Sequence, residues 1–469
     1  MPKTDDERRL ILDACDQIRL VQNLPEDLQQ QIAQIRESSF GSSYFERLRR
    51  WVGKRLHSDY DSVGATGFSA ADKRASELAE EGFTKGISET EIKWLTSPEA
   101  ENVWSFGYRL GELDKKGMFF DQILFSTPDN LNSLFLSSYL QGERLTAGPE
   151  RGENMLDRVA QEKPEAAFGA TWRGPATMAN AERIIRLVSS GRVDGSMLRI
   201  LLYGAWVGNL PPEGIVKMVD LMLHHQPKNN LESVLGIIDQ SVRSGAIAVQ
   251  EFSELVWHAL EIEPQMPSPN FDWRWAQVAN LVAVENPSRL ARIFVRFFES
   301  DETWLSTDSA QGVLRTATVS NPAAVWEVIG PALLRGDSTS LRLRLKLDHW
   351  FGDLLPAELL LDWARDHGSR AFLISASLLN AKTIPLSHTA KLLVKYAPKP
   401  GDVMGVLTGG MKSGGFWGPM SARLEQDIAI LEKWANDDEP TIREWAQIEL
   451  RSTKKSIQQH KLFEEEQRD

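Results

Sequence analysis

Apolar residues recur along this chain at the spacing of an α-helix. In segment 287–298 they fall at positions i, i+3, i+4, i+7 and i+8, which places them on one helical face. These residues are Leu290, Ile293, Phe294, Phe297 and Phe298. Segment 322–334 repeats the pattern, and both segments begin at a proline. Proline is favoured there because its missing N–H would have no partner in the first turn. The pattern therefore predicts two amphipathic helices.

The helical segments start at regular intervals. Their starts lie near residues 181, 212, 249, 287, 322, 356, 386 and 421. An interval of roughly 30 to 40 residues is typical of the helix–turn–helix unit of repeat proteins. We therefore predict an all-α fold, built as an α-solenoid of helical pairs. Its predicted parts are an N-terminal helical segment with a basic helix at 1–60, an irregular helical region at 61–180, repeats at 181–455 and a polar tail at 456–469.

One segment has a different period. Leucines alternate with basic residues from Leu341 to Leu347, which is formally the pattern of a β-strand. A single strand among helices would leave its backbone N–H and C=O groups without partners. We therefore predict a helix here, with Ser338 or Ser340 as its N-cap.

The clearest repeat unit lies near the C-terminus. An acidic turn leads to Pro440, and apolar residues then follow at helical spacing. With Asp438 and Arg443, this segment resembles the second helix of a HEAT repeat. In that family the acidic residue and the arginine brace successive repeats, so the resemblance implies structural roles for Asp438, Pro440 and Arg443. We expect Arg443 to contact an acidic or carbonyl group in the adjoining turn.

A second resemblance extends over residues 60–469. It is carried by the runs Ser97-Pro98-Glu99-Ala100, Phe106-Gly107-Tyr108-Arg109-Leu110-Gly111, Arg173-Gly174-Pro175 and Asn180-Ala181-Glu182-Arg183. Together with the closing acidic helix, these runs resemble helical C-terminal regions of bacterial STAND-type ATPases linked to antiphage defence. In those proteins such regions sense a partner, while a nucleotide-binding module lies upstream. The resemblance implies a sensor role, and this sequence contains no such module.

Composition and charge narrow the function classes. Acidic residues outnumber basic ones by 65 to 53, which gives a net charge of −12. An acidic protein repels phosphate backbones, so extensive nucleic-acid binding is disfavoured unless a local basic patch overrides the charge. The charged N-terminus lacks a signal sequence, and no apolar run approaches the roughly 18 residues of a membrane span. We therefore expect a cytoplasmic protein that does not contact membranes.

Tryptophan is unusually frequent, with 15 residues against 6 tyrosines. Each tryptophan buries a large apolar surface. The simpler interpretation is that the rings wedge helical pairs together, and the alternative is that some of them line a binding groove.

Four patterns were tested for chemistry. The glycine-rich run from Gly405 to Gly415 lacks the direct Gly-Lys-Ser order of a phosphate-binding loop, so we predict a flexible connection. The adjacent pair His224 and His225 cannot share one helical face, and it favours a helix-end position. Cys15 is the only cysteine, which excludes an internal disulfide and cysteine-based zinc sites.

The fourth pattern is the triplet Glu91-Ile92-Lys93, which matches the end of a nuclease motif but falls in a helical segment. None of the four patterns supports catalysis. We therefore expect a chain that is not an enzyme, with no catalytic residues, metal, cofactor or small-molecule substrate.

Two basic clusters are candidate contact surfaces. Arg47, Arg50 and Lys54 share one face of the N-terminal basic helix, opposite apolar residues. The second cluster consists of Arg335, Arg342, Arg344 and Lys346. Such runs often form solvated faces or pair with local acids. The alternative is a docking surface for an acidic protein or a phosphate backbone.

These observations favour a non-enzymatic interaction or sensor scaffold. We predict that it binds a protein partner, within a larger complex, and the antiphage context follows only from the resemblance. The alternative is a nucleic-acid-binding helical solenoid that uses the basic clusters. A salt titration separates the two, because phosphate binding weakens steeply with ionic strength.

Overall fold

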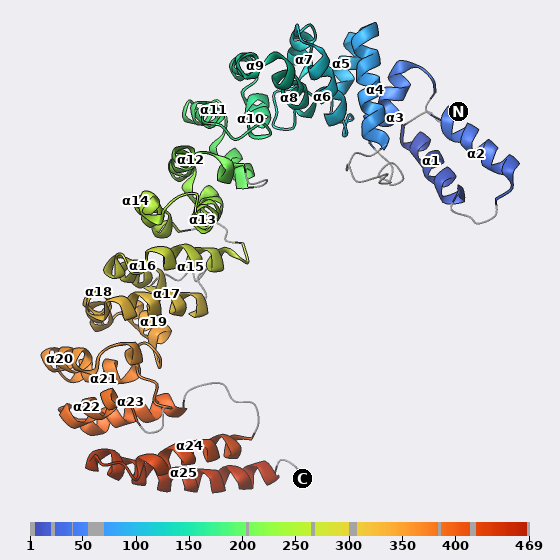
Figure 1. The fold of residues 1–469 in the computed structure, drawn as a ribbon. Coiled ribbons are helices and arrows are strands. Elements are labelled where there is room, and N and C mark those ends of the chain that lie inside the picture. The colour runs from blue at the N-terminus through green and yellow to red at the C-terminus, as the bar shows by residue number, and fades with distance from the viewer. Residues whose placement is uncertain are drawn as a thin grey trace. The chain divides into compact units, whose positions relative to one another are not determined.

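The computed structural model describes residues 5–19, 24–39, 41–54, 70–202, 206–263, 268–299, 307–382, 386–412 and 419–466. Every regular element in these ranges is helical (Figure 1), so the predicted all-α class is confirmed for the described part of the chain. The chain divides into two compact units, Met1–Ile237 and Ile238–Asp469.

The first unit holds the helices up to α12 and most of α13. Their bounds are α1 Asp5–Arg19, α2 Glu26–Ser38, α3 Tyr44–Trp51, α4 Ala70–Lys85, α5 Glu89–Leu95, α6 Trp104–Leu113, α7 Phe120–Ser126, α8 Leu134–Ala147, α9 Pro149–Glu162, α10 Pro164–Trp172, α11 Met178–Ser189, the 3-10 helices η2 Gly195–Leu202 and η3 Val207–Asn209, α12 Pro212–His224 and α13 Pro227–Arg243. The division between the units falls inside α13, whereas the sequence suggested boundaries near residues 60 and 180.

The second unit holds the remaining helices. Their bounds are α14 Val249–Glu261, α15 Phe271–Val282, α16 Pro287–Glu299, α17 Thr307–Ser320, α18 Pro322–Leu334, α19 Ser338–Leu347, the 3-10 helix η4 Gly352–Leu354, α20 Ala357–His367, α21 Ser369–Ser377, α22 His388–Tyr396, α23 Pro400–Lys412, α24 Met420–Trp434 and α25 Pro440–Glu466.

Within each unit, helices pack mainly against their neighbours in the chain. In the first unit α6 packs against α4 and α8, and α8 packs in turn against α9 and α10. In the second unit α16 packs against α17 and α18, and α21 packs against α20, α22 and α23. Each core is therefore built mainly from contacts between helices that are at most three apart in the chain, as the chain-order colours of Figure 1 make visible.

Glycine allows α6 and α8 to approach each other closely. A Cβ atom added at Gly111 would lie 2.1 Å from the backbone oxygen of Tyr139, and one at Gly142 would lie 2.0 Å from that of Tyr108. Any larger residue would push the two backbones apart. The crossing fixes the positions of the first residues of both helices, Trp104 and Leu134.

The predicted apolar stripes lie where the spacing placed them. The five residues of the predicted stripe on α16, Leu290, Ile293, Phe294, Phe297 and Phe298, are each at most 5% exposed. Helix α19 is also confirmed, although its N-cap is Asp337, which accepts a hydrogen bond from the Ser340 backbone N–H at 2.8 Å. The prediction of Ser338 or Ser340 as the cap was wrong, because a carboxylate stood one residue before the expected start.

One further sequence prediction was also wrong. The run Gly405–Lys412 is not a connection but part of α23. A buried stripe that includes Met404, Leu407 and Met411 holds this helix despite its glycines. Residues 413–418 lie outside the described part. The polar tail is helical as far as Glu466, since α25 continues beyond residue 455 and Ile457 is only 7% exposed.

None of the helices in the described ranges is long and apolar enough to span a bilayer.

Candidate functional site

An open cleft of about 500 Å³ lies in the first unit. Its lining residues are Trp104, Leu134, Trp172, Arg173, Gly174, Pro175, Ala176, Trp206 and Asn209. We refer to it as the tryptophan cleft, because three indole rings line it. The rings come from the start of α6, the end of α10 and the residue that precedes η3.

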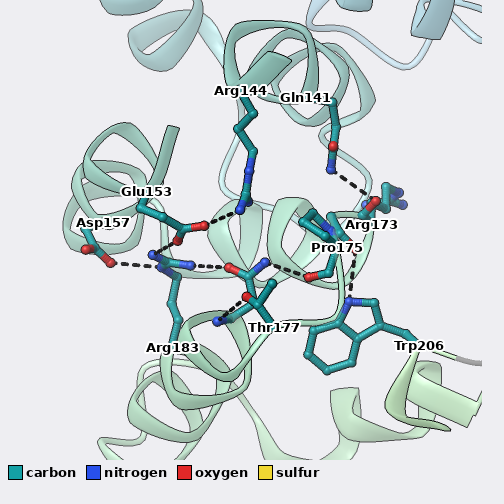
Figure 2. A network of polar contacts seen from close by, with 11 residues as sticks. Gln141, Arg144, Glu153, Asp157, Arg173, Pro175, Thr177, Arg183 and Trp206 are labelled. Carbon is teal, nitrogen blue, oxygen red and sulfur yellow. Dashed lines mark hydrogen bonds and ion pairs between the residues drawn. The ribbon is translucent and has the colours of Figure 1, made fainter. Parts of the chain in front are cut away.

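The loop 173–177 forms one wall of the tryptophan cleft. It begins where α10 ends and stops at Thr177, the N-cap of α11, whose side chain accepts a hydrogen bond from the Asn180 backbone N–H. Gln141 donates to the carbonyl of Arg173 at 3.2 Å, and the indole Nε1 of Trp206 donates to the carbonyl of Gly174 at 3.0 Å (Figure 2). Two consecutive carbonyls of this loop are thereby held by side chains from other elements.

A network of charged side chains centred on the buried Arg183 supports the same loop. Arg183 is only 2% exposed, and its guanidinium donates to Glu153 at 2.6 Å and to Asp157 at 2.9 Å. Glu153 pairs with Arg144 at 2.5 Å as well, so two arginines share one carboxylate (Figure 2). Such charge-assisted contacts are stronger than neutral hydrogen bonds, and together they join α8, α9 and α11.

Asn180 connects the network to the loop. Its side-chain oxygen accepts from Arg183 at 2.5 Å, and its side-chain nitrogen donates to the carbonyl of Pro175 at 2.8 Å. The side chain is fully buried. The position of Pro175 in the cleft wall therefore depends on Arg183, which acts on it through Asn180.

Arg173 brings a positive charge to the tryptophan cleft. One of its terminal nitrogens donates to the carbonyls of Leu131 at 2.8 Å and Gly169 at 3.1 Å, and its guanidinium carbon lies 5.0 Å from the centre of the Trp172 ring. Burial lowers the pKa of Arg173, and no carboxylate among the described residues lies within ion-pair distance of it. The charge is partly desolvated and has only neutral partners.

The indole groups differ in their accessibility. Trp104 is 39% exposed and Trp206 is 5% exposed. The Nε1 atom of Trp172 is buried and has no hydrogen-bond partner in the described structure. None of the lining residues carries a carboxylate, imidazole or thiol. The tryptophan cleft therefore offers apolar surface, one cation and the Asn209 amide, which suits binding rather than bond-breaking chemistry.

A smaller cleft of about 280 Å³ shares Leu134 with the tryptophan cleft. Ser97, Pro98 and Ala100 line part of it. The neighbouring Glu99 accepts a hydrogen bond from the indole of Trp94 at 2.9 Å. Two of the runs that carry the STAND-type resemblance, those at 97–100 and 173–175, therefore line these two clefts.

The first predicted basic cluster is not an open strip of cations. Arg47 makes two hydrogen bonds to Glu81, at 2.7 and 2.8 Å, and these, followed by one from Lys85, lower the pKa of Glu81 to about 2. Arg50 is only 8% exposed and lies over the Trp51 ring. Lys54 is exposed. The pairing of Arg47 spans 34 residues, so helical spacing alone did not reveal it.

The second predicted basic cluster lies at the end of α18 and on α19. Arg335 donates to the carbonyl of Ala332, and the Nε atom of Arg344 is buried without a hydrogen-bond partner. Arg342 and Lys346 are four residues apart, so they share a helical face from which Arg344 is turned away. The structure brings only two of the four cations onto one face.

The contact predicted for Arg443 is present in the turn before α25. Arg443 donates to the carbonyl of Asp437 at 2.9 Å, which is the contact expected of it, and Pro440 begins α25. The buried carboxylate of Asp437 pairs with Lys391 of α22 at 2.8 Å. Asp438 is exposed. The acid of this turn that pairs with another helix is therefore Asp437, one residue before the Asp438 that the resemblance indicated.

The other sequence candidates occupy structural positions. His224 ends α12, and its Nδ1 lies 2.8 Å from the carbonyl of Asp220. Glu91 belongs to the capping box of α5, as its helical context implied, and Cys15 is buried. In the described ranges, no three His, Cys, Asp or Glu side chains lie together as a group that could hold a metal ion.

Comparisons of this chain with protein-family models, curated proteins and solved structures each gave no match.

Proposed function

We propose that this chain is a non-enzymatic interaction scaffold that binds a protein partner in the tryptophan cleft. One observation carries the proposal: three tryptophans and a partly desolvated arginine converge on one open cleft. Tryptophan and arginine are enriched among the residues that dominate binding energy at protein interfaces. The binding groove is the second of the two interpretations of the tryptophan content.

We further propose that the helices within each unit are arranged as a HEAT-like α-solenoid. The packing of helices mainly against those that follow closely in the chain supports this arrangement, because a helical pair in a solenoid contacts its neighbouring pairs. The Arg443–Asp437 contact supports the HEAT-like assignment of the last helical pair, α24 and α25.

The biological setting that we propose is a cytoplasmic sensor subunit of a bacterial antiphage system, within a larger complex. Its support is the resemblance of the runs at 97–100, 106–111, 173–175 and 180–183. Residues 173–175 line the tryptophan cleft, and Asn180 and Arg183 hold its wall.

The nucleic-acid alternative has weaker support. Arg47 is paired with Glu81 and Arg50 is buried, so the first basic cluster offers few free cations for phosphates. The protein also carries a net charge of −12. A nucleic-acid surface needs several available cations, because each phosphate contact adds to the affinity.

Partner capture from the native host tests the proposed function. The Trp104→Ala variant removes an exposed ring from the tryptophan cleft, and Trp273→Ala removes a ring that is 51% exposed on α15, outside it. We expect the wild-type chain and Trp273→Ala to retain the same protein, identified by mass spectrometry, and Trp104→Ala to lose it. Equal recovery by both variants would place the contact elsewhere.

A further inference from the structure

The charge of Arg173 differs in its partners from the arginines of the neighbouring helices α6, α8, α9 and α11. The arginines of α6, α8, α9 and α11 each lie within 4.0 Å of at least one carboxylate. They are Arg109, Arg144, Arg151, Arg158, Arg183 and Arg186. Arg173 instead bonds two backbone carbonyls and lies over an indole ring, and burial alone lowers its pKa. A partly buried cation without an opposite charge is costly, and a carboxylate brought by a ligand would offset that cost.

The surroundings of Arg173 indicate the size and polarity of the ligand. The tryptophan cleft is open and has a volume of about 500 Å³, which accommodates a few residues of an extended chain. Trp104, which lines the cleft, is 39% exposed, and Asn209, which also lines it, is exposed. An apolar side chain would cover the indole, and the amide of Asn209 would be free to bond a peptide group.

The same surroundings argue against a nucleic acid in this cleft. Among the described residues that line it, Arg173 is the only cationic one. A strand of nucleic acid carries a charge on every phosphate and is held by a series of cations, on a protein surface that is not strongly acidic. A single cation matches a single carboxylate better.

We propose that the tryptophan cleft binds an extended, acidic peptide segment of the partner. An Asp or Glu side chain of that segment pairs with Arg173, and a neighbouring apolar side chain packs on Trp104. This inference rests on the proposed function, to which it adds the chemical class of the partner segment. Arg173 then determines the selectivity for acidic over neutral segments, and Trp104 provides most of the apolar contact.

Random peptides displayed on phage and selected against the full chain test the inference. We expect the enriched sequences to share an acidic residue next to an apolar one, and to be lost when the selection is repeated on Trp104→Ala. The best sequence is then synthesised with its acidic residue intact and with that residue changed to the corresponding amide. Fluorescence anisotropy measures the affinity of both peptides for the wild-type chain.

We expect the amide to weaken binding to the wild-type chain by about ten-fold or more, the size of a hydrogen bond to a charged group. On Arg173→Gln both peptides should bind equally and weakly. Arg199→Gln, which removes an exposed arginine of η2, should still distinguish them. If Arg173→Gln does not fold, the two peptides on the wild-type chain decide the question alone.

Three results overturn the inference, and they separate it from the proposed function. Peptides that need Trp104 but bind equally as acid and amide refute the role of Arg173 and leave the cleft as a protein-binding site. The absence of any peptide that depends on Trp104 removes both proposals. Displacement of the peptide by single-stranded DNA, with a steep dependence on salt, would favour the nucleic-acid alternative instead.

Discussion

Replacement of Arg183 by methionine tests the charge network that holds the cleft wall. The substitution keeps an apolar stem in the buried site and removes the contacts to Glu153, Asp157 and Asn180. Removal of one partner of a buried ion pair costs about 3–5 kcal/mol when the remaining charge is stranded. Here Glu153 keeps Arg144 at 2.5 Å, and Asp157 is 48% exposed, so neither carboxylate is left isolated.

We therefore expect a smaller loss of stability, about 2–3 kcal/mol, for Arg183→Met. Urea unfolding followed by circular dichroism measures it. The matched control is Arg186→Gln on the same helix, because Arg186 is 64% exposed and contacts the same Asp157 at 3.5 Å. Its loss should stay below about 0.5 kcal/mol. Equal effects of the two substitutions would refute the conclusion that the network holds the loop 173–177.

Four more predictions concern the fold and its stability. Gly111→Ala should destabilise the chain by about 1–3 kcal/mol in urea unfolding, because its Cβ would meet the Tyr139 backbone oxygen at 2.1 Å. Gly405→Ala, with nothing within 4 Å, should stabilise it by about 0.5–1 kcal/mol, and a loss there would contradict the helix α23. Burial raises the pKa of Glu143, so its contribution to stability is full at pH below the unfolded value of 4.5 and is lost as pH rises through the higher folded pKa. The melting temperature of Glu143→Gln, relative to the wild-type chain, should therefore be higher at pH 7 than at pH 4. A difference that does not change with pH would contradict this reasoning. Arg443→Ala should cost about 1–2 kcal/mol, the value of one hydrogen bond from a charged group, and an unchanged melting temperature would argue against the brace in the last unit.

The local part of the fold could be predicted from the sequence. The stripes of α16 and α18 show which residues face the core, since burial of a continuous apolar face determines helix formation. The alternating leucines of α19 fit the same rule: Leu343 and Leu347 are buried one turn apart, whereas Leu341 and Leu345 are 48% and 63% exposed. A period of two along the chain is compatible with a helix when only alternate leucines reach the core.

The cleft could not be predicted, because it depends on how helices cross. Trp104, Trp172 and Trp206 stand 68 and 34 residues apart, which are multiples of 34, but no flanking motif distinguishes these three from the other tryptophans. They meet because Gly111 and Gly142 let α6 and α8 cross closely and because the network at Arg183 fixes the loop between α10 and α11. The signal that the sequence did contain was the excess of tryptophan and the run Arg173-Gly174-Pro175.

The surroundings of the basic clusters could not be predicted for a related reason. Helical spacing shows which residues share a face of one helix, but it does not show which side chains of other helices pack against that face. Arg47 meets Glu81 from α4, and Arg50 is covered by packing. The substitution of Arg47 and Arg50 by glutamate would therefore perturb folding as well as any contact surface.

Hydrogen–deuterium exchange of the full chain, with and without the captured partner, tests the central claim most directly. Exchange at backbone amides reports which segments become covered or rigid on binding. If the tryptophan cleft is the binding site, the amides of 172–177 and 206–209 should be protected together, while those of 44–54 and 335–347 should not change. Protection confined to 44–54 or 335–347 would show that the partner binds a basic cluster, and would contradict the assignment of the cleft.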